Sequence, residues 1–241
     1  MTERGMIFNA EMVRAILDGR KTQTRREVKL NLDIARLATT YDWATSLAAN
    51  HYQGLAEEQI QQKAESLRGV IHPVILDNGQ MVSIICPHGK PGDRIWVREA
   101  FRVHSLATDV ATLVYKASER NSWTEQTHRV PVAVCNKPAT PEKWTPSLHM
   151  PRWASRILLE ITNVRVERLN AISEEDARAE GIIDGGCLNC GEPEPCGCAN
   201  PEPDATDAFA YLWQSIYGQE NWNADPWVWV IEFKRVEGGA A

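Results

Sequence analysis

The chain has 241 residues, of which 43% are hydrophobic and 24% are charged, an ordinary balance for a globular protein. A chain of this length can bury a core without disulfide bonds. No apolar run reaches the roughly 18 residues that cross a bilayer, and the amino-terminal residues lack the basic and apolar segments of a secretory signal. We therefore expect a cytoplasmic protein. The net charge of −6 argues against a protein that coats nucleic acid in general.

Charge is unevenly distributed along the chain. Residues 20–29 carry five basic side chains against one acid, whereas residues 171–207 carry ten acidic side chains against one arginine. A local basic patch on an acidic protein fits recognition of a few phosphate groups better than binding along a duplex. Both segments can equally be ordinary solvated faces.

The first elements predicted are helical. Residues 9–18 have one apolar stripe, with Asn9 as the N-cap and Gly19 just past the end. A basic turn follows at residues 19–26. Residues 31–69 contain no proline and are rich in alanine, leucine, glutamine and glutamate, which favours an added helical hairpin.

Strand signals dominate the middle of the chain. A strand pair is expected over residues 70–86, turning at 77–79, followed by a turn at 87–93 and a strand at 94–99. Further strands are expected at 112–116 and 129–135, then an ordered irregular loop at 136–152. Residues 156–169 form a long β segment whose apolar phase changes near Asn163, as a bulge would cause.

The carboxyl-terminal third returns to short helices and one strand. Ser173 begins a helix with a capping-box pattern, and Gly181 ends it. Residues 204–217 predict another helix, and residues 227–234 a last strand with alternate apolar residues on one face. Short strands with scattered helices predict an α+β fold, in the form of a small barrel with insertions.

Three stretches of the sequence resemble the ASCH family, a branch of the PUA-like superfamily. They are residues 17–26, with the pattern Gly-x-Lys-Thr-x-Thr-x-Arg; residues 90–97, with a Gly-Asp turn before a strand; and the strand–helix unit 157–181 with the closing strand 230–234. They cover under half of the chain. The long form, with residues 144–153, looks like ASCH proteins carried by phages and prophages. The resemblance implies one PUA-like domain over residues 1–241, a small β-barrel with flanking helices and a helical insertion at about 31–69.

One compact branch of this family is similar to bacterial N4-acetylcytidine amidohydrolases. The resemblance implies that Lys21, Thr24 and Glu180 are catalytic. Amide hydrolysis needs a nucleophile, a base and stabilisation of an oxyanion. Thr24 would be the nucleophile, Lys21 its base and Glu180 the group that orients Lys21 or moves the proton, although Lys21 and Thr24 can exchange roles. A lysine acts as a base only if burial or nearby positive charge lowers its pKa. The plainer alternative is an exposed turn and an ordinary helix residue.

Further residues are candidates for substrate binding. Trp96 offers a face for stacking, and Glu99 an acceptor for the amino group of a base. We expect these two residues and Arg98 to share the pocket of Lys21, unless Trp96 belongs to the core and Arg98 and Glu99 to the surface. The full set of candidates is Arg20, Arg25, Arg26, Trp96, Arg98, Glu99, His149 and Arg152. The arginines of the basic turn also supply positive charge near Lys21, and the last two candidates would contact phosphate.

Four of the six cysteines lie within twelve residues, at Cys187, Cys190, Cys196 and Cys198. Glycines in the same segment allow tight turns. Four thiolates suit a closed, tetrahedral zinc site, so the sequence predicts a structural zinc loop at about 183–203. An iron–sulfur cluster, two disulfides or unligated thiols are the alternatives.

These observations support three functions. The first is an amidohydrolase that removes an acyl group from the exocyclic nitrogen of a modified cytidine or related nucleobase, either free or within a single-stranded nucleic acid. The second is a non-catalytic ASCH module that binds RNA or DNA. The third is a phage accessory protein that binds a host protein through its acidic loop. Salt-sensitive binding to oligonucleotides would favour the second function.

Overall fold

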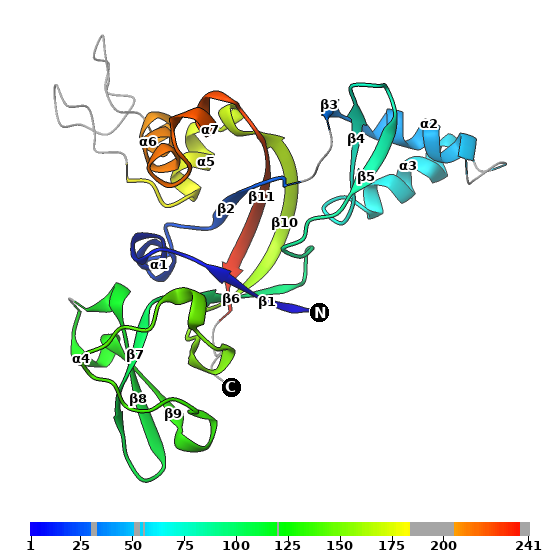
Figure 1. Cartoon of the computed structure of the whole chain (residues 1–241). Helices are drawn as coiled ribbons and strands as arrows, with labels where there is room; N and C mark the ends of the chain where they lie inside the picture. The colour runs from blue at the N-terminus through cyan, green and yellow to red at the C-terminus, as the bar shows by residue number, and fades with distance from the viewer. Residues whose placement is uncertain (30–32, 51–53, 55, 120, 184–204, 237–241) are drawn as a thin grey trace.

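The computed structural model describes residues 1–29, 33–50, 54, 56–119, 121–183 and 205–236. These residues form an α+β protein with three sheets (Figure 1). The largest has the strand order β1-β6-β10-β11-β2, and the others have the orders β3-β4-β5 and β7-β8-β9. The small closed barrel is not formed by the described residues, because β1 and β2 end the largest sheet and do not pair with each other.

The five-stranded sheet carries the site described below. Its strands are β1 (Glu3–Ile7), β2 (Gln23–Glu27), β6 (Arg94–Arg98), β10 (Leu158–Arg168) and β11 (Trp227–Arg235). β1 and β6 are parallel, and the other neighbouring pairs are antiparallel. The predicted bulge is present, since the register of β10 against β11 shifts between Ile161 and Asn163.

Strand β11 is buried on both faces, which the alternation in its sequence did not predict. Trp229 and Ile231 pack into the main core, as expected. Val228 and Val230 are also fully buried, because they contact a second core that lies under α6 (Ala205–Tyr217) and beside α5 (Glu174–Ala179). A central strand covered on both faces needs apolar residues at every position.

The two short helices beside the site have the predicted caps. In α1 (Ala10–Leu17) the side chain of Asn9 accepts a hydrogen bond from the backbone N–H of Met12 at 2.8 Å. In α5 the hydroxyl of Ser173 accepts one from the N–H of Asp176 at 3.2 Å. The predicted basic turn is shorter than expected, because β2 begins at Gln23 and takes up its second half.

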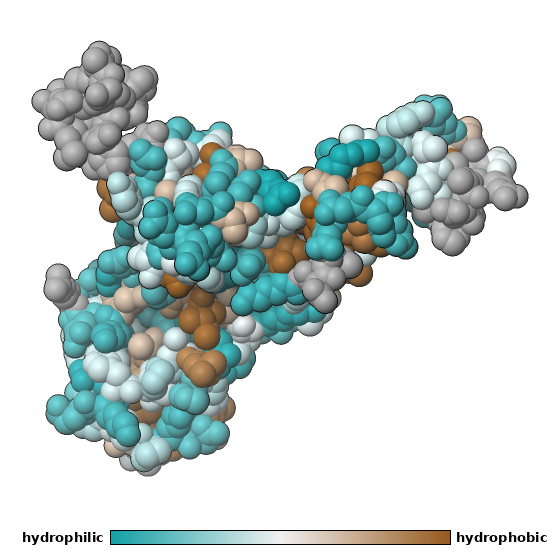
Figure 2. Space-filling model, turned by 45° about the horizontal axis from the view of Figure 1, so that its top comes forward, coloured by the Kyte–Doolittle hydropathy of each residue, from teal (hydrophilic) through white to brown (hydrophobic). Residues whose placement is uncertain are grey.

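The insertion is larger than a helical hairpin. It contains β3 (Ile34–Leu37), α2 (Thr40–Asn50), α3 (Glu57–Ser66), β4 (His72–Leu76) and β5 (Met81–Ile84). The hairpin turn at 77–79 is confirmed, and Gly79 has a positive φ of 81°. The insertion extends to one side of the main sheet (Figures 1 and 2).

The remaining sheet lies beyond the other side of the main sheet. It is built from β7 (Phe101–Leu106), β8 (Val110–Tyr115) and β9 (Thr127–Pro131), with the short α4 (Trp123–Gln126) beside it. Its core includes Phe101, Tyr115 and Met150, so the irregular loop predicted at 136–152 is ordered by packing. Strand β7 was not predicted. After α6 a short helix, α7 (Gln219–Asn223), precedes β11, and no helix in the described ranges has the length and apolar character to cross a membrane.

Candidate active site

Lys21 and Glu180 form a buried ion pair although 159 residues separate them. The Lys21 ammonium nitrogen lies 2.6 Å from Oε2 of Glu180 and 2.7 Å from the backbone carbonyl oxygen of the same residue. The side chain of Lys21 is fully buried and that of Glu180 is 4% exposed. An ion pair so far from solvent is costly to form unless its geometry is good.

Backbone contacts bring these two side chains together. Lys21 and Glu180 form an isolated antiparallel bridge, in which the N–H of Thr22 donates to the carbonyl of Ala179 at 2.8 Å. The N–H of Lys21 donates to the carbonyl of Ala15 in α1 at 3.0 Å. The end of α5 is thus joined to the chain that leaves α1.

Gly181 allows this close approach. Its φ is +90°, and a Cβ added there would lie 2.8 Å from Cβ of Ala15 and 3.0 Å from Cβ of Lys21. We expect Gly181→Ala to destabilise the protein by more than about 1 kcal/mol, since it combines an unfavourable φ with overpacking. Urea denaturation measures the change, with Gly79→Ala as control, because that glycine has a positive φ but no atom near its Cβ position. Equal losses in both variants would show that packing at Gly181 contributes nothing.

Arg25 connects Glu180 to two further carboxylates. Its guanidinium lies 3.3 Å from Oε1 of Glu180, 2.5 Å from Glu167 and 2.8 Å from Asp176. The Arg25 side chain is fully buried. Asp176 also binds Arg165 at 2.7 Å, so an unbroken series of ion pairs runs from Lys21 to Arg165. The charge of Arg25 is committed to these carboxylates, which leaves it unsuited to the predicted role in substrate binding.

The surroundings lower the pKa of Lys21. Burial lowers the pKa of Lys21, the Glu180 carboxylate opposes this change, and Arg26 and Arg25 add to it. The net shift is downward, as a catalytic base requires. The amino group of Lys21 donates two hydrogen bonds to Glu180, one to the carboxylate and one to the backbone carbonyl.

Two hollows of different size meet at Glu180. The larger, of about 450 Å³, is bordered by Arg20, Glu180, Gly181 and Leu212. The smaller, of about 20 Å³, is bordered by Thr24, Glu180 and Leu212. The first can hold a nucleoside-sized ligand, and the second has room for about one water molecule. Thr24 is 2% exposed and is one of the residues that border the narrow cleft.

The other basic residues of the motif lie at the rim. Arg20 is exposed, donates to the carbonyl of Gly181 at 2.9 Å and pairs with Asp18 at 3.0 Å. Arg26 donates to the carbonyl of Ile7 at 2.8 Å, and its guanidinium lies over the ring of Phe8.

Trp96, Arg98 and Glu99 are not brought to Lys21. β6 is separated from β2 by β10 and β11. The Arg98 guanidinium stacks on Trp96 at 5.3 Å and donates to the carbonyl of Leu148. Glu99 is 2% exposed and binds Arg156 through two hydrogen bonds of 2.9 and 3.0 Å. Burial raises the pKa of Glu99, which Arg156 opposes. These residues join the main sheet to its neighbouring segments.

The last sequence candidates are also apart from Lys21. His149 is exposed in a short 3-10 turn within the loop at 136–152, and Arg152 pairs with Glu3 at 2.9 Å. Cys187, Cys190, Cys196 and Cys198 lie outside the described residues.

Sequence reasoning missed the acidic partners of Arg25. Asp176 and Glu180 are four residues apart at α5, so they share a helix face. That spacing was a usable signal. Glu167 lies on β10 and reaches Arg25 across β11, and no local pattern indicates that contact.

Comparisons were made with protein-family models, curated proteins and solved structures, and none of them matches this chain.

Proposed function

We propose that this protein is an amidohydrolase that removes an acyl group from the exocyclic nitrogen of a modified cytidine or related nucleobase. The observation that carries the proposal is the buried contact between Lys21 and Glu180, next to a cleft that contains Thr24. The ASCH resemblance selects the same three residues from the sequence. The PUA-like fold is part of this proposal. In it, the five-stranded sheet corresponds to an opened form of the PUA-like barrel.

The proposed reaction gives each of the three motif residues a role. Neutral Lys21 accepts the hydroxyl proton of Thr24 while the oxygen attacks the acyl carbon. The proton then passes to the nitrogen of the leaving base, the C–N bond breaks, and an ester to Thr24 remains. A water molecule in the narrow cleft hydrolyses the ester, which releases a carboxylic acid and restores Thr24. Glu180 holds Lys21 in place through the two hydrogen bonds that it accepts from the amino group.

The larger hollow is the proposed place of the base. Glu180 borders both hollows, so a base held in the larger one can direct its acyl group toward Thr24. Arg20 lies at the rim, where its exposed guanidinium can contact a phosphate of a nucleotide or single strand.

The first test is hydrolysis of N4-acetylcytidine followed by chromatography. We expect conversion to cytidine and acetate by the wild type and a loss of at least about 100-fold in Lys21→Met, the range of a general base. Lys116→Met, at an exposed lysine just after β8, is the matched control. Absence of turnover by a folded wild-type protein on both N4-acetylcytidine and an acetylated oligonucleotide would refute the proposal.

One observation favours nucleic-acid binding as a second candidate. A hollow of about 300 Å³ is bordered by Arg26, Lys29, His88, Tyr217 and Trp229, which combines cations for phosphate with aromatic surface. Fluorescence anisotropy with a labelled single-stranded oligonucleotide tests it. Binding that weakens as salt is added, and that is weaker in Lys29→Ala, supports this function. An affinity that neither salt nor Lys29→Ala changes would exclude nucleic-acid binding at this hollow.

The structural zinc loop and the cytoplasmic location are further parts of the proposal. Their support is the spacing of the four clustered cysteines and, for a reducing cytoplasm, the free thiols of Cys86 and Cys135. A host protein as partner of the acidic loop rests on charge alone. We expect about one equivalent of zinc in freshly purified protein, measured by elemental analysis. Less than about half an equivalent would count against the site.

A further inference from the structure

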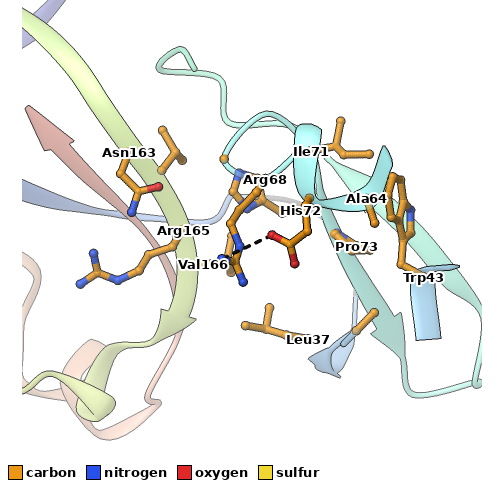
Figure 3. A pocket seen from close by; sticks show the side chains of 14 residues that line it. Leu37, Trp43, Ala64, Arg68, Ile71, His72, Pro73, Asn163, Arg165 and Val166 are labelled. Atoms are coloured by element: carbon orange, nitrogen blue, oxygen red, sulfur yellow. Dashed lines mark ion pairs between the residues drawn. The ribbon is translucent and has the colours of Figure 1, made fainter. Parts of the chain in front are cut away.

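A cavity of about 410 Å³ lies between the insertion and the main sheet, away from Lys21 (Figure 3). The insertion contributes apolar walls that include Leu37, Trp43 and Ile71, and β10 contributes the four consecutive residues 163–166. Four successive residues can line one hollow only if it runs along the edge of the strand, since side chains alternate between faces. The size and the mixed lining are those of a small-molecule site between two structural units.

The edge of β10 at this cavity has no strand partner among the described residues. β6 pairs with β10 only over Leu158–Glu160. Along the other edge of β10 lies β11, whose successive residues form backbone hydrogen bonds alternately to β2 and to β10. Phe233 donates to Thr22 and Val28 donates to Trp227, so the odd-numbered residues of β11 bond toward β2 and the even-numbered ones toward β10.

The register then shows which backbone N–H and C=O groups of β10 do not bond to β11. Asn163 and Arg165 lie opposite Glu232 and Val230, so their backbone groups bond to β11. Val164 lies between these two residues and Val166 follows them. The backbone N–H and C=O groups of both valines therefore point away from β11. The carbonyl oxygen of Val164 lies 3.5 Å from the Cβ position of Gly69 in the insertion, which confirms that direction.

The free edge is short. Gly69 stands beside Val164 and closes one end, and the cavity lining stops at Val166. Two outward residues span roughly 7 Å, too little for an added peptide strand of ordinary length. The same length suits one planar heterocycle, which would meet an acceptor at Val164 and a donor at Val166.

Other groups around the cavity suit an uncharged aromatic ligand. His72 is 8% exposed, and its Nε2 has no hydrogen-bond partner in the described structure. Burial lowers the pKa of His72 to about 4, so the ring is neutral at pH 7. In Figure 3 the side chains of Asn163 and Arg165 point away from the insertion, whereas the side chains of Val164 and Val166 pack in the main core. Arg68, 76% exposed and 3.5 Å from Glu65, is placed to contact a phosphate.

We propose that this cavity binds a nucleotide whose base carries an exocyclic amine beside a ring nitrogen acceptor, as adenine and cytosine do. The amine donates to the carbonyl of Val164, and the ring nitrogen accepts from the N–H of Val166. The base lies between the apolar wall of the insertion and the strand edge. This site is independent of the proposed chemistry at Lys21.

Nuclear magnetic resonance with amide-labelled protein tests the proposal, using AMP, IMP, CMP and UMP as probes. We expect AMP and CMP to shift the amide of Val166. IMP and UMP present a carbonyl where the others present the amine, so they would oppose the Val164 carbonyl and bind at least about tenfold more weakly. Ala64→Leu narrows the cavity and is expected to weaken AMP binding by at least about tenfold. Gln62→Leu, exposed on the same helix, is the control.

Equal affinity for AMP and IMP would contradict the proposed hydrogen bonds between the base and the backbone of β10. Shifts confined to residues outside the cavity, or no shift with any of the four nucleotides at millimolar concentration, would overturn the site itself. The AMP and IMP comparison uses wild-type protein, so it holds even if Ala64→Leu fails to fold. Lys21→Met is expected to bind AMP like the wild type, which keeps the outcome separate from that of the hydrolysis assay.

Discussion

Glu180→Ala is expected to destabilise the protein by about 3–5 kcal/mol and to abolish hydrolysis. The substitution leaves the Lys21 side chain, which is fully buried, without its carboxylate. Removing one partner of a buried ion pair strands the other charge in a medium of low polarity. It also frees the lysine that the proposed mechanism needs in a fixed place. Urea denaturation gives the change in the free energy of unfolding.

A double-mutant cycle separates charge from packing at this pair. Adding Lys21→Met to Glu180→Ala removes the stranded charge, so the double variant is expected to be more stable than Glu180→Ala alone. Lys21→Met alone should cost less, since Glu180 keeps Arg25 as a partner. Glu175→Ala, exposed on the same helix, is the control. A Glu180→Ala protein as stable as that control would contradict the account.

Arg25→Met is expected to cost about 3 kcal/mol at pH 7, the low end for a broken buried pair. The value is at the low end because two of its three carboxylate partners, Glu167 and Asp176, keep 20% and 22% of their side-chain surface exposed. Arg165→Met, which removes a 30% exposed arginine from the same series, should cost less.

The cost of Arg25→Met is also expected to depend on pH. Burial opposes ionisation of Asp176, but Arg165 and Arg25 outweigh it, so the pKa of Asp176 is lowered in the folded protein. A lowered carboxyl pKa contributes stability that is present above the unfolded value of about 3.9 and is lost as pH falls through the folded value. Without Arg25 this contribution shrinks. Urea denaturation should therefore show a difference from wild type that is larger at pH 7 than at pH 3. A difference independent of pH would rule out the ion pairs as its cause.

Local signals in the sequence predicted much of the fold. The caps at Asn9 and Ser173, the turn at 77–79 and the bulge near Asn163 all appear in the structure. Each depends on a few neighbouring residues, whose hydrogen bonds and φ preferences act within one turn or one strand. The three residues selected by the motif include the pair Lys21 and Glu180, and the structure places these two in contact.

Tertiary structure alone decided the surroundings of that pair. Strand order, which no local pattern encodes, places Trp96 and Glu99 away from Lys21 and buries both faces of β11. It also turns Arg25 from a predicted substrate-binding residue into a buried partner of three carboxylates. Periodicity and capping report how a segment folds, whereas the partner of a buried charge depends on which distant segment packs against it. The sequence by itself thus determined the elements and the motif, and packing determined what each charged side chain meets.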